Sequence, residues 1–205
     1  MLVPPSVHHL SPEAGALSGR TNRYEKRLSE LAGLYADAAA FGAALEQGDK
    51  VVYAVEDFRP SAAHGDLCFG VTHMQPGRIG DEFFMTRGHI HAVANRPETY
   101  RGELGRGVML MESPDGQVAT LEVTPGATVY VPPFWIHRSV NVGDDPLVMT
   151  FVYPADSGQD YGIIARSNGM RLRVVADGAA WRTVENPDWR PRTAEEVAAI
   201  HATGA

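Results

Sequence analysis

The sequence predicts an all-β dominated protein, an antiparallel sandwich or barrel, with short helices confined to its two ends. Between Val51 and Val175 the chain consists of short runs rich in β-branched and aromatic residues. Proline, glycine and aspartate turn signals separate these runs, and helical periodicity occurs only before and after them. The chain also lacks the strand–helix alternation and the glycine-rich loop that are typical of a parallel nucleotide-binding sheet.

The predicted strands follow one another at short intervals along the middle of the chain. In each run valine, leucine, phenylalanine, tyrosine, methionine or threonine predominates, and a turn sequence such as Pro-Gly or Pro-Asp-Gly follows many of them. Many short strands with such turns favour closure of the sheet into a barrel or sandwich. The runs are residues 51–55, 67–72, 107–111, 117–123, 128–131, 147–153 and 171–175.

Helical signals flank the predicted barrel. Leucine and tyrosine recur at helical spacing over Arg23–Leu45, and Asp37 can cap a short helix over the alanine-rich stretch that follows it. Near the other end, Thr193 and Glu196 form a capping box ahead of a short apolar run. Both helices are expected to pack on the outside of the sheet.

The chain length of 205 residues suits one domain with three parts. Residues 1–50 are expected to form an N-terminal arm and a helical segment that packs on the barrel. Residues 51–176 are expected to form the barrel itself. Residues 177–205 are expected to be a C-terminal tail that carries the short helix.

Composition narrows the possible partners. A net charge of −7 argues against nucleic acid or an anionic membrane as the main partner, because both require a basic surface. The single cysteine, Cys68, fits a reducing compartment. The N-terminus lacks the pattern of a signal peptide, and no apolar run reaches the length of a membrane-spanning helix, so a cytoplasmic protein is expected.

The most informative stretch holds two histidines one residue apart, His89 and His91, followed by Glu98. On a β-strand alternate side chains share a face, so the two imidazoles can reach one metal ion. Asn95, Arg96 and Pro97 suit a turn that returns Glu98 to the same place. Two imidazoles and a carboxylate are a mixed nitrogen and oxygen set suited to Fe(II), Mn, Zn or Ni.

A further candidate ligand is His137. Thr128–Val131 is a predicted strand, and Pro132 and Pro133 exclude a central ladder position after it. His137 is therefore expected to open the next strand, which runs to Asn141. A histidine alone at such a position is usually a packed or solvated residue, and it becomes a candidate ligand only because of the stretch that precedes it.

The spacing of Gly126, Pro132, His137 and Asn141 resembles the second metal-binding motif of the cupin superfamily. Phe134 departs from that motif, because it stands where a glycine is common. The resemblance implies a cupin barrel, which is a double-stranded β-helix or jelly roll. Generic cupin motifs say little about the reaction.

The first motif is more specific. His91 and Glu98 are separated by more residues than in the general cupin pattern, and this longer spacing resembles the archaeal-type, or cupin-type, glucose-6-phosphate isomerases. The segments Gly80–His89 and Tyr153–Gly162 also match that family, so the resemblance extends over roughly Val51–Val175. It implies a metal-dependent isomerase of glycolysis and gluconeogenesis that interconverts glucose 6-phosphate and fructose 6-phosphate.

The resemblance also implies roles for individual residues. It implies one divalent metal per subunit, Fe2+ before Mn2+, Zn2+ or Ni2+, and an enediol mechanism or a metal-assisted hydride shift, between which the sequence does not decide. Where the family often has a histidine, this chain has Gln159, whose amide does not titrate near neutral pH. The implied residues are His89, His91, Glu98 and His137 for the metal, Glu98 and Tyr153 for catalysis, and Thr72, Thr86, Gly88, Tyr100, Tyr153 and Tyr161 for the sugar phosphate.

Other functions fit parts of the same pattern. A cupin enzyme could act on another sugar phosphate such as mannose 6-phosphate, or be an Fe(II) oxygenase, and a non-catalytic sugar-binding cupin could hold the metal for structure alone. Glu98 beside the histidine pair favours catalysis, because a structural site is usually closed by fixed ligands. The resemblance further suggests a homodimer.

Overall fold

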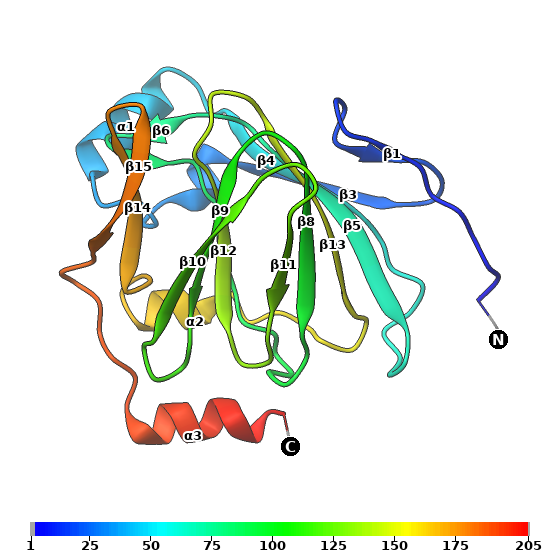
Figure 1. Ribbon diagram of the computed structural model, residues 1–205. Coiled ribbons are helices and arrows are strands. Elements are labelled where there is room, and N and C mark those ends of the chain that lie inside the picture. The colour runs from blue at the N-terminus through cyan, green and yellow to red at the C-terminus, as the bar shows by residue number, and fades with distance from the viewer. Residues whose placement is uncertain (1–2, 205) are drawn as a thin grey trace.

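Antiparallel β-sheets form the walls of a barrel in the computed structural model, which describes residues 3–204 (Figure 1). The larger sheet has strand order β11-β8-β13-β5-β4-β3, and the second has order β10-β9-β12. Strands that are neighbours in space are often distant in sequence, as expected for a jelly roll. The bounds are β3 Asn22–Arg27, β4 Val51–Phe58, β5 Leu67–Met74, β8 Glu98–Leu104, β9 Gly107–Glu112, β10 Val118–Val123, β11 Thr128–Val131, β12 Ile136–Asn141 and β13 Leu147–Pro154.

Smaller elements surround these sheets. A third sheet of order β15-β14-β7-β6 stands at one end of the barrel, and a two-stranded sheet lies near the N-terminus (Figure 1). Helix α3 lies below the barrel in the view of Figure 1. Their bounds are β1 Leu10–Ser11, β2 Ala16–Leu17, the 3-10 helix Leu28–Leu31, α1 Ala38–Glu46, β6 Arg78–Ile79, β7 Glu82–Phe83, α2 Gly162–Arg166, β14 Leu172–Asp177, β15 Ala180–Glu185 and α3 Ala194–Ala202.

The prediction of a β-dominated barrel with short helices at both ends is confirmed. All the runs expected to be strands are strands, and the two predicted helix caps are present. Asp37 accepts a hydrogen bond from the Ala40 amide at 2.8 Å, and Thr193 and Glu196 make the reciprocal bonds of a capping box. Among residues 3–204, no helix combines the length and the apolarity that crossing a membrane requires.

The prediction of a helix over Arg23–Leu45 is wrong for its first part. Asn22–Arg27 is strand β3, which pairs along β4, and Leu28–Leu31 is a 3-10 helix; the α-helix begins only at Ala38. Both Leu28 and Leu31 are buried, and their spacing of three residues fits a 3-10 turn as well as an α-helix. The composition of β3 is polar and does not indicate a strand. Its backbone hydrogen bonds to β4 hold it at the edge of the sheet. The strand thus extends the barrel wall.

Leu147 belongs to the hydrophobic core and is fully buried at the start of β13. We expect Leu147→Ala to lower the free energy of unfolding by about 2–5 kcal/mol, because it removes buried methyl groups and leaves a cavity. Chemical denaturation measures this loss. Val152→Ala on the same strand is the control, since Val152 is exposed, and its unfolding free energy should change much less.

Candidate metal centre and substrate pocket

Three of the predicted ligands converge in the interior of the protein. Ligand atoms of His89, Glu98 and His137 all lie within 4.8 Å of one another, and all three side chains are buried. The Nε2 atoms of His137, His91 and His89 lie 3.1, 3.3 and 4.0 Å from Oε2 of Glu98. Three imidazoles thus approach one oxygen of one carboxylate, so the structure brings together all four of the predicted residues.

Two of these side chains are positioned by the first residues of strands. Glu98 is the first residue of β8, and His137 follows the first residue of β12. His89 exchanges two backbone hydrogen bonds with His137, at 3.0 and 2.9 Å. The expectation that the histidine pair lies on a regular strand is wrong, because His89 and Ile90 form only isolated bridges and Gly88 just before them has a φ of 74°. That left-handed residue interrupts the ladder.

Hydrogen bonds from the other ring nitrogen, Nδ1, orient two of the imidazoles. Nδ1 of His91 lies 2.7 Å from the Arg96 carbonyl oxygen, and Nδ1 of His137 lies 3.1 Å from that of Trp135. A carbonyl oxygen accepts only, so each Nδ1 carries a proton and donates it. This leaves the Nε2 atom of each ring on the side of Glu98, which is the arrangement typical of metal-binding histidines.

The electrostatics of the cluster also fit a cation. Nε2 of His89 and of His91 are buried without a hydrogen-bond partner, which is costly for a polar atom unless another group binds it. Burial lowers the pKa of His89 well below its usual value, which keeps that ring neutral. Burial by itself raises the pKa of Glu98, but the close approach of the His137 and His91 imidazoles outweighs it and holds the pKa below its ordinary range. Neutral imidazoles and one carboxylate are a suitable donor set for a divalent transition metal.

The loop between His91 and Glu98 is held from outside the barrel. Arg96 donates two hydrogen bonds to the carboxylate of Asp156, at 3.0 and 2.7 Å. Its carbonyl oxygen accepts from His91, so the ion pair supports the orientation of that ring. The side chains are about one fifth exposed, at 22% and 18%, which limits the expected strength of the pair.

We therefore expect Arg96→Met to weaken metal retention modestly. A loss of roughly 1 kcal/mol corresponds to about a fivefold increase in the dissociation constant of the metal. Competition with a chromophoric chelator measures that constant. Arg101→Met is the matched control, because Arg101 pairs with Glu103 on the same sheet and makes no bond to the loop. Equal metal affinity in Arg96→Met and the wild type would contradict this support.

The turn ahead of His137 contains a strained residue. Phe134 has a φ of 72°, a left-handed conformation that favours glycine, the residue common at this place in the cupin motif. Its amide donates to the Ala94 carbonyl oxygen at 2.6 Å, and its ring centroid lies 4.7 Å from that of His201 in α3. The turn before the third histidine is thus joined both to the loop before Glu98 and to the last helix.

A narrow pocket of about 50 Å³ adjoins the metal-ligand cluster. Among the predicted substrate residues, Thr72, Thr86, Gly88, Tyr100 and Tyr161 line it, together with His89 and His137. Tyr153 does not line this pocket; its ring packs 5.7 Å from that of His91. The pocket lining therefore includes all the predicted substrate residues except Tyr153, which packs on His91.

Gly88 is required by its surroundings. A Cβ atom at this position would lie 2.7 Å from a methyl carbon of Ile164 and 3.0 Å from the His137 carbonyl oxygen, and the residue has positive φ. Only glycine fits here without strain. Its neighbour Thr86 accepts a hydrogen bond from the Ser139 amide at 3.0 Å and keeps its hydroxyl proton available as a donor.

Several pocket residues were not predicted from the sequence. Tyr24, Tyr53, Arg138 and Ser139 also line it. Tyr53 lies in a predicted strand, whose side chains point alternately to the two faces of the sheet. It could have been found by deciding which of these faces points inward. Tyr24 belongs to β3, which was expected to be helical. The position taken by Gln159 is also in the pocket, where its side-chain oxygen accepts a hydrogen bond from the Tyr161 hydroxyl.

Comparison with known proteins gives the same family as the sequence motifs. Residues 25–190 match the model of the family described as glucose-6-phosphate isomerase (GPI). A putative glucose-6-phosphate isomerase 1 of Rhizobium meliloti is 54% identical over 98% of this chain and 94% of its own. The glucose-6-phosphate isomerase of Pyrococcus furiosus is 39% identical over 87% of this chain and 93% of its own.

Among solved structures, oxalate oxidase in complex with glycolate overlaps 54% of this chain and 55% of its own, at 16% identity and a TM-score of 0.46. The match to the family model extends over β4 to β15 and over the four residues His89, His91, Glu98 and His137. The chain therefore belongs to the glucose-6-phosphate isomerase family.

Proposed function

We propose that this enzyme interconverts glucose 6-phosphate and fructose 6-phosphate with one divalent metal ion held by His89, His91, Glu98 and His137. The family match supports the reaction. One observation carries the metal dependence: buried imidazole Nε2 atoms, unpartnered in two of the three rings, converge on Oε2 of a buried carboxylate. A core without a bound cation would not leave such atoms unpaired.

The family resemblance makes Fe2+ our first assignment. Mn2+, Zn2+ and Ni2+ are alternatives, because a site of three nitrogens and one oxygen suits all of them. When bound, the cation would hold the C1 and C2 oxygens of the open-chain sugar and offset negative charge that develops on them. A carboxylate that stays ionised in the core, as the lowered pKa of Glu98 indicates, supports cation binding.

For the proton transfer between C1 and C2 we assign Glu98 as the base. All the imidazole contacts of Glu98 are made through Oε2, so Oε1 is the atom that we place against the sugar carbons. Tyr100, two residues later on the same face of β8, would position the sugar. We assign Tyr153 a supporting role through its packing on His91.

For the phosphate we assign Thr72, Thr86 and the amide of Gly88, with Tyr161 closing the pocket. Hydroxyls and a glycine amide can approach phosphate oxygens closely without a P-loop. A pocket of about 50 Å³ is too small for a hexose phosphate, so side chains around it must move as the substrate enters. Tyr161 is the side chain that we expect to move, because it is partly exposed and rests on Arg87, whose guanidinium lies 5.5 Å from its ring.

The fate of the transferred hydrogen tests the role of Glu98. Glucose 6-phosphate labelled with deuterium at C2 is converted in ordinary water, and the product is analysed by NMR. A proton carried by a carboxylate exchanges with solvent during some turnovers, so we expect deuterium to be lost to water. Complete retention at C1 of the product would instead assign a direct hydride shift and leave Glu98 as a metal ligand only.

The homodimer remains a prediction from the family resemblance, and the cytoplasmic location remains one from composition. Sedimentation of the purified protein measures the first.

A further inference from the structure

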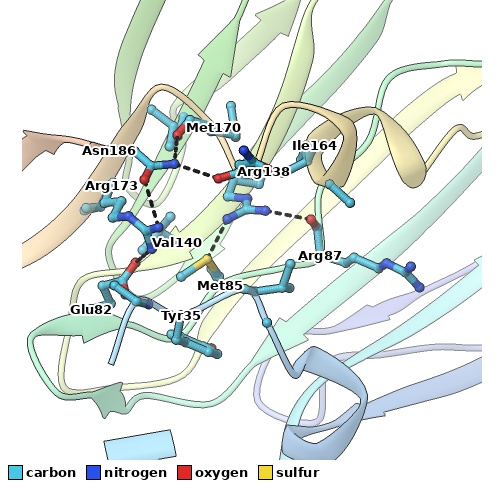
Figure 2. Close-up of a pocket in the computed structure, with 18 of the residues that line it drawn as sticks. Tyr35, Glu82, Met85, Arg87, Arg138, Val140, Ile164, Met170, Arg173 and Asn186 are labelled. Carbon is cyan, nitrogen blue, oxygen red and sulfur yellow. Dashed lines mark hydrogen bonds and ion pairs between the residues drawn. The ribbon is translucent and has the colours of Figure 1, made fainter. Parts of the chain in front are cut away.

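A second and larger pocket, of about 510 Å³, lies outside the barrel wall (Figure 2). Its floor is the outer face of β9 and β12, which contributes Leu110, Arg138 and Val140. The segment from Glu30 to Ala36 and helix α2 with the residues after it form its sides. His137 and Arg138 alternate along β12, so the metal-ligand cluster and the floor of this pocket lie on opposite faces of one strand.

Arg138 occupies this floor as a buried cation without a carboxylate partner. It is 6% exposed, and none of the ion pairs formed among residues 3–204 includes it. Its guanidinium donates to Sδ of Met85 at 2.8 Å and to the Arg87 carbonyl oxygen at 2.9 Å, while its Nε has no partner (Figure 2). A thioether is a weak acceptor, so a buried charge is left poorly compensated.

A second arginine faces the same space. Arg173 donates to Oε1 of Glu82 and to Oδ1 of Asn186, each at 3.0 Å, and its Nε is also buried without a partner (Figure 2). Glu82 is further engaged by the Ala36 amide, at 2.6 Å from Oε2. The pocket lining therefore contains two largely buried arginines and one buried carboxylate, so positive charge exceeds negative charge there. The other acidic lining residues, Glu30 and Asp188, are exposed, as expected at a rim.

Apolar side chains also line the pocket, among them Leu34, Met85, Ile164, Met170 and Val174. Pockets of roughly 300–1,000 Å³ with apolar walls and a few convergent polar groups are typical of small-molecule sites. The volume admits a ligand of several carbon atoms, and the arginines select its charge. Arginine matches the geometry of phosphate and carboxylate groups.

We propose that this pocket binds a small organic anion whose phosphate or carboxylate group pairs with Arg138 and Arg173 and whose carbon skeleton lies against Met85 and Ile164. The site does not depend on the metal, but it adjoins the substrate pocket, because Arg138 and Tyr161 line both pockets. Arg138 also follows His137 in the chain and donates to the carbonyl oxygen of Arg87, the residue before Gly88.

Titration calorimetry on the full-length, metal-loaded protein tests this site. The probes are phenyl phosphate for the phosphate source, benzoate for the carboxylate source and benzyl alcohol as the neutral analogue, at constant ionic strength. We expect saturable binding of at least one anionic probe and none of benzyl alcohol. Whichever anionic probe binds identifies the group that the arginines prefer.

Two variants locate the binding. Ala165→Phe fills the pocket from an exposed position on α2, and Arg173→Met removes one cation; each should weaken binding at least tenfold. Ala199→Phe, an exposed position on α3 outside the pocket, is the matched control and should bind like the wild type. If Arg173→Met does not fold, Ala165→Phe alone decides. Absence of saturable binding by both anionic probes, or undiminished affinity in Ala165→Phe, overturns the proposal.

Discussion

Glu98→Gln is expected to lower kcat by about a thousandfold or more, because the substitution removes both the proposed base and the only negative charge among the three imidazoles. The amide has the same shape, so the barrel should keep its circular dichroism spectrum. The measurement is steady-state isomerisation of fructose 6-phosphate, with the glucose 6-phosphate formed oxidised by a coupling dehydrogenase. It is made at saturating metal, so that weaker metal binding does not hide the loss of the base.

Glu103→Gln is the control for this substitution. Glu103 lies on the same strand but accepts hydrogen bonds from Arg101 and Thr150, away from the proposed metal centre. Its kcat should remain within about twofold of the wild type. A metal-saturated Glu98→Gln enzyme with near-normal kcat would remove Glu98 from the chemistry.

Removal of the metal is expected to abolish isomerisation and to lower the melting temperature. A site occupied at a hundred times its dissociation constant stabilises a fold by about 2.7 kcal/mol. For a chain of this length each kcal/mol corresponds to about 2–4 °C, so thorough chelation should lower the melting temperature by roughly 5–11 °C. Differential scanning calorimetry and the coupled assay measure the two effects on the same sample.

Reloading with Fe2+, Mn2+, Zn2+ or Ni2+ in separate portions should restore both properties, and the order of recovered activity ranks the metals. Mg2+ serves as the control, because it prefers an all-oxygen octahedral site and should restore neither. Full turnover by a sample without measurable transition metal would exclude the proposed cofactor. A restored melting temperature without activity would instead indicate a structural ion.

The barrel could be predicted because its strands carry their own signals. Runs such as Leu147–Pro154 have strong β composition, and the pattern alone places them in a sheet. Strand β3 has no such signal, since its residues are mostly polar and exposed. The ladder to β4 makes it a strand, and a single sequence does not display which segment will pair with which.

The four proposed metal ligands could be predicted because their residue types and spacing restrict the possible chemistry. Their backbone geometry could not, since the left-handed φ of Gly88 breaks the expected strand. Tyr153 is the predicted substrate residue that stands outside the lining of the small pocket; its ring packs on that of His91, and its role stays a prediction. The isolation of Arg138 is likewise a tertiary property, decided by which carboxylates the fold leaves elsewhere.

Phe134 shows how a departure from a family motif can be accommodated. A bulky residue in a left-handed conformation costs of order 1–3 kcal/mol and persists only where neighbouring structure holds it. His201 is such a neighbour, because its ring packs on that of Phe134. Helix α3 therefore supports the turn that precedes a proposed metal ligand. Removal of α3 should therefore disturb the turn before His137, although the helix itself contributes no residue to the proposed metal centre.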